Sequence, residues 1–273
     1  MEPMIEFANG ALTLGNRRVL KDVSFNVMPN EILAILGGSG SGKTTLLRLA
    51  LGLVKADQGT VKVMGQDITR MPERDLFGIR QKMAMVFQYS ALFDSLPVRE
   101  NVGYRLWEQG KLSDEQIEEK VRESLKFVGM EDTANKMPAE LSGGMRKRVG
   151  IARALASDAK LLLYDEPTAG LDPVNTHMIV RLILRLKATG FTQVVVTHDL
   201  DTAYRVADRV VLLLKGTVLF DGTPDELKAS EDAAVKAFLD PSSIQSEWVP
   251  VPHEDSFPEE ASGRAAPAQR RRS

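Results

Sequence analysis

The chain of 273 residues contains no cysteine. Disulfides, thiolate metal sites and cysteine nucleophiles are therefore excluded, and the absence suits a reducing compartment. No apolar run approaches the roughly 20 residues that a membrane-spanning helix needs. Residues 1–4 also lack the basic and then apolar pattern of a signal segment. We therefore expect a chain that is either soluble or held at a membrane by a partner.

A surplus of charge of one sign is also missing, since the formal net charge is −2. Such a balance provides no global basic field of the kind that marks many nucleic-acid-binding proteins. Hydrophobic residues make up 43% of the chain, which is enough for a sizeable core. The length allows one large α/β domain or two small ones. We expect such a domain, with no nucleic-acid partner.

A glycine-rich stretch dominates what is present, and it has the form G-x-x-x-x-G-K-[ST]. Its residues are Gly37, Gly38, Ser39, Gly40, Ser41, Gly42, Lys43, Thr44 and Thr45. An apolar run at 32–36 predicts a buried strand before it, and a run at 46–51 predicts a helix after it. In this context the loop amides and the helix N-terminus face one anion, whereas a loop that only turns the chain would not need Lys43 and Thr44. We assign Lys43 to the β- and γ-phosphates and Thr44 to Mg²⁺.

Three other apolar runs, each predicting a buried strand, end in polar side chains: Gln88, the pair Asp165 and Glu166, and His198. In an open α/β sheet the carboxyl ends of the strands lie on the ligand side. Asp165 is expected to hold Mg²⁺, and Glu166 to orient and deprotonate the water that attacks the γ-phosphate. His198 is expected to contact the γ-phosphate, although a lone histidine is more often structural. Gln88 faces either the metal and water or only solvent.

A second anion site is predicted at the sequence Leu-Ser-Gly-Gly-Met, residues 141–145. Ser142 is a plausible N-cap, so the following helix offers a hydroxyl, free N–H groups and a positive dipole end. One phosphate group does not need two such sites from one chain. Either Ser142 is only a structural cap, or the site serves a nucleotide held by another subunit.

The remaining segments predict how the chain is organised. Short apolar runs and turns in residues 4–36 indicate an antiparallel flank beside the main sheet. Residues 89–107 have a loop-like character with many aromatic side chains, which either pack internally or face a partner protein. A helix is expected to begin with the capping box of Ser113. Prolines and mixed charges in 240–273 indicate a tail that is mobile or docks on a partner subunit.

Together these residues resemble the ATP-binding subunits of ABC transporters. The resemblance covers residues 4–239 and implies a P-loop ATPase core, with a mostly parallel sheet, an antiparallel flank and a helical insertion at about 89–158. The corresponding motifs are Walker A at Gly37 to Thr44, the Q-loop at Gln88, the signature at Leu141, Ser142, Gly143, Gly144 and Met145, Walker B ending in Asp165 and Glu166, the D-loop at Asp172 and the switch histidine at His198.

This resemblance also implies an ATPase that uses ATP and Mg²⁺. The implied metal ligands are Thr44, Gln88 and Asp165, and the implied catalytic residues are Lys43, Gln88, Glu166 and His198. Two copies are expected to form a head-to-tail homodimer. Each ATP then lies between one Walker A loop and the signature residues of the other copy, which answers the question of the second anion site.

Two short stretches, 88–102 and 137–145, resemble the Mla (toluene-tolerance) group of lipid-transport ATPases, which have Met where most transporters have Gln after the signature glycines. The resemblance implies a complex with an integral membrane permease, an MCE-domain substrate-binding protein and a STAS-domain protein. It places the chain at the cytoplasmic face of the inner membrane, energising phospholipid movement between inner and outer membranes. The alternatives are another importer, for amino acids or metal chelates, and a soluble ABC ATPase without a transport role.

Two positions depart from the family pattern. Family members usually carry an aromatic residue that stacks on adenine, and our alignment puts Leu12 there. A leucine offers apolar contact without π-stacking, so we expect adenine to be held more loosely. Gly38 replaces the usual proline, which should make the loop more flexible without removing a phosphate donor.

Overall fold

The computed structural model describes residues 2–157 and 159–240. Its centre is a six-stranded sheet with the order β10-β9-β3-β8-β7-β6. The strands are β3 (Ile32–Leu36), β6 (Met83–Val86), β7 (Leu161–Asp165), β8 (Thr192–Thr197), β9 (Arg209–Leu214) and β10 (Thr217–Gly222). All neighbours pair in parallel except β10, which forms an antiparallel hairpin with β9. Strands β3, β7 and β8 are buried throughout, which is why they appear in the sequence as continuous apolar runs.

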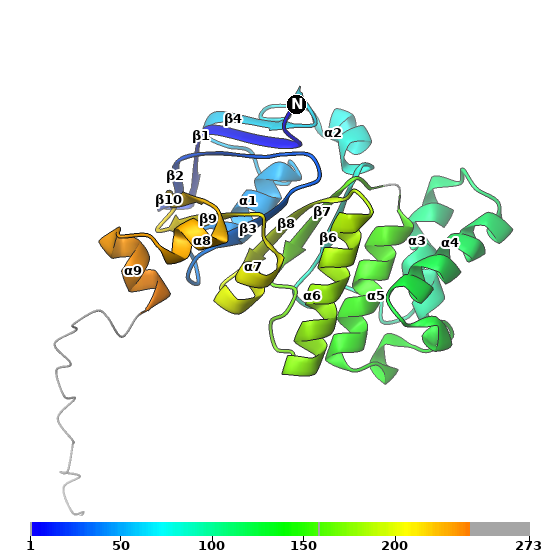
Figure 1. The fold of residues 1–273 in the computed structure, drawn as a ribbon. Coiled ribbons are helices and arrows are strands. Elements are labelled where there is room, and N and C mark those ends of the chain that lie inside the picture. The colour runs from blue at the N-terminus through cyan, green and yellow to red at the C-terminus, as the bar shows by residue number, and fades with distance from the viewer. Residues whose placement is uncertain (1, 158, 241–273) are drawn as a thin grey trace, which may run out of the picture.

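A smaller antiparallel sheet covers one face of the large sheet, with helix α1 (Lys43–Ala50) between them (Figure 1). Its order is β2-β1-β4-β5, formed by β1 (Ile5–Leu14), β2 (Arg17–Val27), β4 (Gln58–Val63) and β5 (Gln66–Asp67). Apolar side chains of both sheets and of α1 form one core cluster. The predicted antiparallel flank is therefore confirmed, and β4 extends it beyond the phosphate loop.

Helices cover the opposite face, and three of them form the expected helical region (Figure 1). These helices are α3 (Val98–Gln109), α4 (Asp114–Phe127) and α5 (Gly143–Ala156), and the short 3-10 turns η1 (Glu131–Thr133) and η2 (Pro138–Glu140) lie between α4 and α5. The predicted capping box of Ser113 and the predicted N-cap at Ser142 are both present. This layer packs against the large sheet in a second core cluster, in which α6 (Pro173–Ala188) also takes part.

The prediction of a loop-like segment at 89–107 is wrong from residue 98 onward, because α3 begins there. Val98, Val102 and Leu106 are fully buried at a helical spacing of four residues. Exposed aromatic neighbours hide this stripe in the sequence. The buried Asn101 then holds the preceding loop, since its side chain accepts from Phe93 N at 2.7 Å and donates to Leu96 O at 2.8 Å.

The remaining helices are α2 (Glu73–Arg80), α7 (Leu200–Val206), α8 (Pro224–Lys228) and α9 (Ala233–Leu239). Within residues 2–157 and 159–240, no helix combines the length and apolar character needed to cross a membrane. Apart from Asp240, the predicted tail at 240–273 lies outside the described residues.

Candidate nucleotide site

The phosphate loop leaves β3 and leads into α1 through a turn in which Gly37 and Gly42 have no room for a side chain. Gly42 adopts φ 109°, and a Cβ there would lie 2.8 Å from the Leu20 side chain. A Cβ on Gly37 would lie 2.3 Å from the carbonyl oxygen of Leu213. The loop is therefore a tight backbone cradle whose amides can approach an anion.

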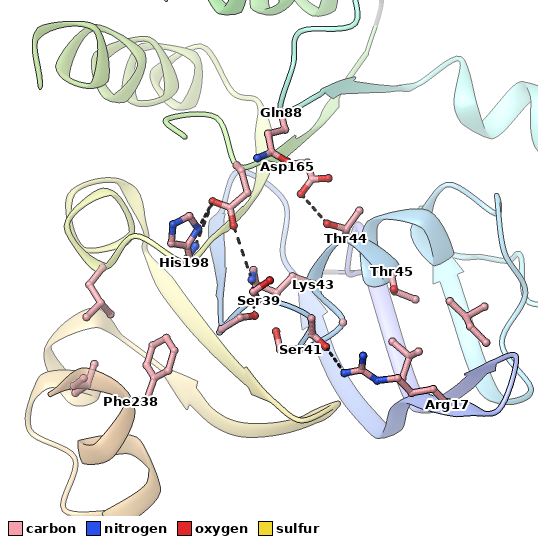
Figure 2. A pocket seen from close by; sticks show the side chains of 18 of the residues that line it. Arg17, Ser39, Ser41, Lys43, Thr44, Thr45, Gln88, Asp165, His198 and Phe238 are labelled. Carbon is pink, nitrogen blue, oxygen red and sulfur yellow. Dashed lines mark hydrogen bonds and ion pairs between the residues drawn. The ribbon is translucent and has the colours of Figure 1, made fainter. Parts of the chain in front are cut away.

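This cradle forms the floor of a cleft of about 840 Å³ (Figure 2). The predicted residues that line it are Gly38, Ser39, Gly40, Ser41, Gly42, Lys43, Thr44, Thr45, Gln88, Asp165, Glu166 and His198. They come from the loop and from the carboxyl ends of three parallel strands, as the ligand-edge rule predicts.

Lys43 lies inside the phosphate loop, with only 7% of the residue exposed. Its Nζ donates to the carbonyl oxygens of Gly37 at 2.7 Å and Gly38 at 3.0 Å. Burial lowers the pKa of Lys43, and the nearby Glu166 and Asp165 oppose that shift. A desolvated ammonium held by neutral carbonyls gains strongly when phosphate oxygens replace them as partners.

Thr44 and Asp165 form the pair that fits Mg²⁺. The Thr44 hydroxyl donates to Asp165 Oδ1 at 2.9 Å. Burial raises the pKa of Asp165, so a cation beside this carboxylate would be favourable. No group of three or more His, Cys, Asp or Glu residues that could hold a metal occurs in the described part of the chain. Mg²⁺ commonly takes one or two carboxylates and completes its shell with phosphate oxygens and water. The donor set therefore suits a nucleotide-bound Mg²⁺, with Gln88 in the same cleft (Figure 2).

Glu166 lies directly after β7 and joins several groups at the cleft. Its Oε2 lies 2.9 Å from His198 Nδ1 and accepts from Thr197 Oγ1 at 3.3 Å. Its Oε1 lies 3.9 Å from Lys43 Nζ. The His198 side chain is 63% exposed, whereas that of Glu166 is only 12% exposed. A carboxylate so placed can hold a water at the cleft, and an exposed imidazole can reach a phosphate.

The signature residues and Asp172 are not brought into this cleft. Ser142 and Gly143 are exposed at the start of α5. Gly144 packs against Asn175, where a Cβ would lie 2.3 Å from Asn175 Oδ1. Asp172 caps α6 through a bond from Asn175 N at 2.9 Å. These residues therefore form a separate edge of the chain, available to a second copy.

The prediction that Leu12 contacts adenine is wrong. Leu12 is 3% exposed and belongs to the core beneath the small sheet, where it is paired with Leu20 across the strands. The register of β1 shifts twice around this residue, so spacing along the sequence does not show which side chains face outward. Leu14, which is 43% exposed, lines the cleft instead.

Several cleft residues were missed from the sequence, among them Arg17 and Phe238. Arg17 donates to Gly40 O at 3.2 Å, which ties β2 to the phosphate loop. Phe238 of α9 lines the side of the cleft opposite Arg17 (Figure 2). Helix α9 lies just before the expected tail, and no local motif marks either residue.

Comparison with known proteins agrees with this geometry. A family model described as ABC transporter matches residues 20–169. The intermembrane phospholipid transport system ATP-binding protein MlaF of Haemophilus influenzae is 38% identical over 237 residues, which are 86% of this chain and 90% of that protein. The methionine import ATP-binding protein MetN of Carboxydothermus hydrogenoformans is 39% identical over 267 residues, covering 96% of this chain and 76% of that protein.

A solved structure extends the likeness to the fold. The dimeric, post-hydrolysis ATP-binding cassette MJ0796 bound to ADP and Pi has a TM-score of 0.74 and is 34% identical, covering 81% of this chain and 99% of that one. The expected P-loop ATPase core is thereby confirmed, as is its use of ATP with Mg²⁺. This chain belongs to the ABC transporter family, as an ATP-hydrolysing subunit.

Proposed function

We propose that this subunit energises phospholipid transport between inner and outer membranes, acting at the cytoplasmic face of the inner membrane. Overall identity does not decide the cargo, since MlaF and a methionine importer are 38% and 39% identical to the chain. The observation that carries the proposal is local. Residues 88–102 and the Met145 that follows the signature glycines resemble the lipid-transport group rather than transporters in general.

The same local segment forms a surface that suits a permease helix. Tyr89 is 86% exposed beside Gln88, and the Phe93 and Tyr104 rings pack with their centroids 4.6 Å apart while both stay 43% exposed. A neighbouring cavity of about 600 Å³ is lined by Leu96, Arg99, Glu100, Tyr104, Trp107, Glu108 and Glu118. An apolar floor with charged walls suits an amphipathic helix. A helix that contacts Tyr89 would lie next to Gln88, which lines the nucleotide cleft. It would therefore respond to bound nucleotide.

In the proposed cycle, ATP binds the phosphate loop and Lys43 offsets charge that develops on the γ-phosphate. Ser142, Gly143 and Gly144 of a second copy, with Asp172 near the contact, close over the nucleotide. Glu166 orients and deprotonates the attacking water, and His198 contacts the γ-phosphate. Mg²⁺, held by Thr44 and Asp165 with Gln88 nearby, supplies further neutralisation of the phosphates when bound.

The proposed assembly is a homodimer of this chain with a permease, an MCE-domain protein and a STAS-domain protein. The experiment is purification of the tagged protein from its own membranes in a mild detergent, followed by mass spectrometry of proteins and lipids. A permease with an MCE-domain protein and bound phospholipid supports the proposal. A permease with an amino-acid- or chelate-binding protein favours the import alternative that MetN represents. Ribosomal or DNA-repair partners without a membrane protein contradict transport altogether.

A further inference from the structure

Lys147 is a buried cation that none of the steps above uses. It lies on α5, five residues after Ser142, and only 5% of the residue is exposed. Its Nζ donates to the carbonyl oxygens of Glu166 at 3.0 Å and Ala169 at 2.9 Å. Both acceptors are main-chain oxygens in the segment that joins β7 to α6. The ammonium therefore fixes the backbone of the segment that begins with Glu166.

The backbone of Glu166 needs such support. Its φ is +50°, in the left-handed region that glutamate seldom occupies. Such a conformation costs on the order of 1–3 kcal/mol and persists only where surrounding contacts impose it. The Glu166 N–H donates to Val196 O at 2.9 Å, and the Glu166 carbonyl also accepts from Ala169 N at 3.2 Å. Strand β8 thus holds one side of this residue, and α5 holds the other.

This backbone conformation determines where the carboxylate points. The φ angle of Glu166 sets the direction of its Cα–Cβ bond, and the observed direction carries Oε2 to 2.9 Å from His198 Nδ1. Oε1 lies 3.9 Å from Lys43 Nζ. Rotation about the N–Cα bond of Glu166 turns its carbonyl and its Cα–Cβ bond together, so a return of φ to an ordinary strand value would carry the carboxylate away from both partners. The direction of the carboxylate therefore depends on the carbonyl bond that Lys147 makes.

We propose that Lys147 is a positioning residue for ATP hydrolysis, which holds the main chain of Glu166 so that its carboxylate faces the nucleotide cleft. The inference rests on the role proposed above for Glu166. Core packing does not explain a lysine here, because an apolar side chain of similar length would fill the space without desolvating an ammonium. The two carbonyls do explain it, since an amine with several N–H groups can serve both at once.

The location of Lys147 gives this role a second consequence. The exposed start of α5 carries Ser142 and Gly143, and this 14-residue helix connects that start to Lys147. A displacement of that start by a second copy therefore reaches Glu166 through one side chain. Contact of this chain's signature residues with the nucleotide of a second copy is thereby linked to the alignment of Glu166 at this chain's own nucleotide.

The test compares Lys147→Met with Lys147→Arg in the purified full-length protein, assembled as it is isolated. We expect Lys147→Met to lower kcat for ATP hydrolysis by about 10–100-fold, as small misplacements of a catalytic group do. The KM and the Kd for ATP should change less than about twofold, because the phosphate loop is untouched. Lys147→Arg, which keeps the donors, should recover most of the rate. Lys126→Met, an exposed lysine on α4, is the matched control and should behave as wild type.

A double-mutant cycle with Glu166→Gln separates positioning from other effects. If Lys147 acts through Glu166, adding Lys147→Met to Glu166→Gln should barely change the residual rate. Three outcomes would each overturn the proposal. The rate losses of the two single variants could multiply in the double variant, Lys147→Met could have a normal kcat, or its ATP affinity could fall as much as its kcat. Lys147→Gln, which keeps an N–H donor, enters the same cycle if the methionine variant unfolds.

The same set distinguishes failure of the underlying assignment. A wild-type rate in Glu166→Gln would overturn the role of Glu166 and the proposal with it. If Glu166→Gln were inactive and Lys147→Met fully active, the proposal for Lys147 would be overturned while the role of Glu166 would stand. None of these rates bears on the cargo, which the membrane purification tests separately.

Discussion

The nucleotide cleft and the signature edge differ in how far one chain completes them. In the cleft, Lys43, Thr44, Asp165, Glu166 and His198 already contact one another through hydrogen bonds or ion pairs. At the signature edge Ser142 and Gly143 are exposed, and the Ser142 hydroxyl caps α5 by accepting from Met145 N at 3.2 Å. The comparison predicts that one chain suffices to bind ATP, whereas the proposed turnover needs two. Substitutions in the two regions should therefore separate these properties.

The largest expected effect comes from Glu166→Gln, which removes the base but keeps the shape of the side chain. Loss of a general base typically costs about 10²–10⁴-fold in rate, so kcat should fall within that range. ATP affinity should be retained, because the phosphate loop is unchanged. Steady-state hydrolysis and size-exclusion chromatography with ATP check both expectations, and the variant should accumulate as an ATP-bound dimer. Wild-type turnover would contradict the assignment.

At the signature edge, Ser142→Ala should spare ATP binding by the single chain while weakening ATP-driven dimerisation. Removing one phosphate donor and a helix cap should lower turnover roughly tenfold, since a hydrogen bond to a charged group contributes about 1.5–3 kcal/mol. Equilibrium ATP titration, sedimentation with ATP and hydrolysis rates measure the three properties. Ser113→Ala, which removes a cap of similar geometry on α4, controls for helix stability. An equal loss in both variants would show that Ser142 is only a cap.

Leu14, which lines the cleft, and Leu12, which lies in the core, allow a matched pair of substitutions. Leu14→Tyr adds an aromatic ring at an exposed cleft position and should tighten ATP binding about 2–10-fold, as stacking contributes about 0.5–1.5 kcal/mol. Leu12→Tyr places the same ring in a packed core and should lower thermal stability instead. Titration with ATP and with tripolyphosphate, which has no base, isolates the adenine contribution. Tighter binding of both ligands would argue against stacking.

The last expected effect concerns pH. Burial lowers the pKa of Lys147 from 10.5 to about 8. Because the folded chain binds this proton less tightly than the unfolded chain, Lys147 adds stability as pH rises from about 8 to 10.5 and loses it as pH falls through 8. The unfolding free energy of the wild type, relative to that of Lys147→Met, should therefore increase as pH rises over that window. Denaturant titrations at pH 7.5 and 9.5 measure the shift, and a pH-independent difference would contradict it.

The parts of the site that the sequence alone predicts are those held by short-range patterns. The run before Gly37 is a strand because a parallel strand buried on both faces must be apolar throughout. The carboxyl ends of such strands meet at one edge of the sheet. The sequence alone therefore predicts that Asp165, Glu166 and His198 lie close together. Their contacts follow from sheet order and do not depend on distant loops.

Other features depend on tertiary contacts that leave no local pattern. The helical stripe of α3 is hidden because its exposed aromatics contribute as much apolar character as its buried valines. The irregular register of β1 turns Leu12 inward and leaves Leu14 at the cleft. The bond from Lys147 to Glu166 joins residues 19 positions apart, and nothing in the signature motif predicts its acceptor.

The position of α9 also sets the limits of a usable fragment. Ala237, Phe238 and Leu239 line the nucleotide cleft, although the family match ends at residue 169. A fragment cut just before α9 would lack one side of the cleft, and one cut at residue 169 would also lose strands β8, β9 and β10 and the cleft residue His198. Truncations and affinity tags should therefore leave every residue up to 240 intact if nucleotide binding is to be measured.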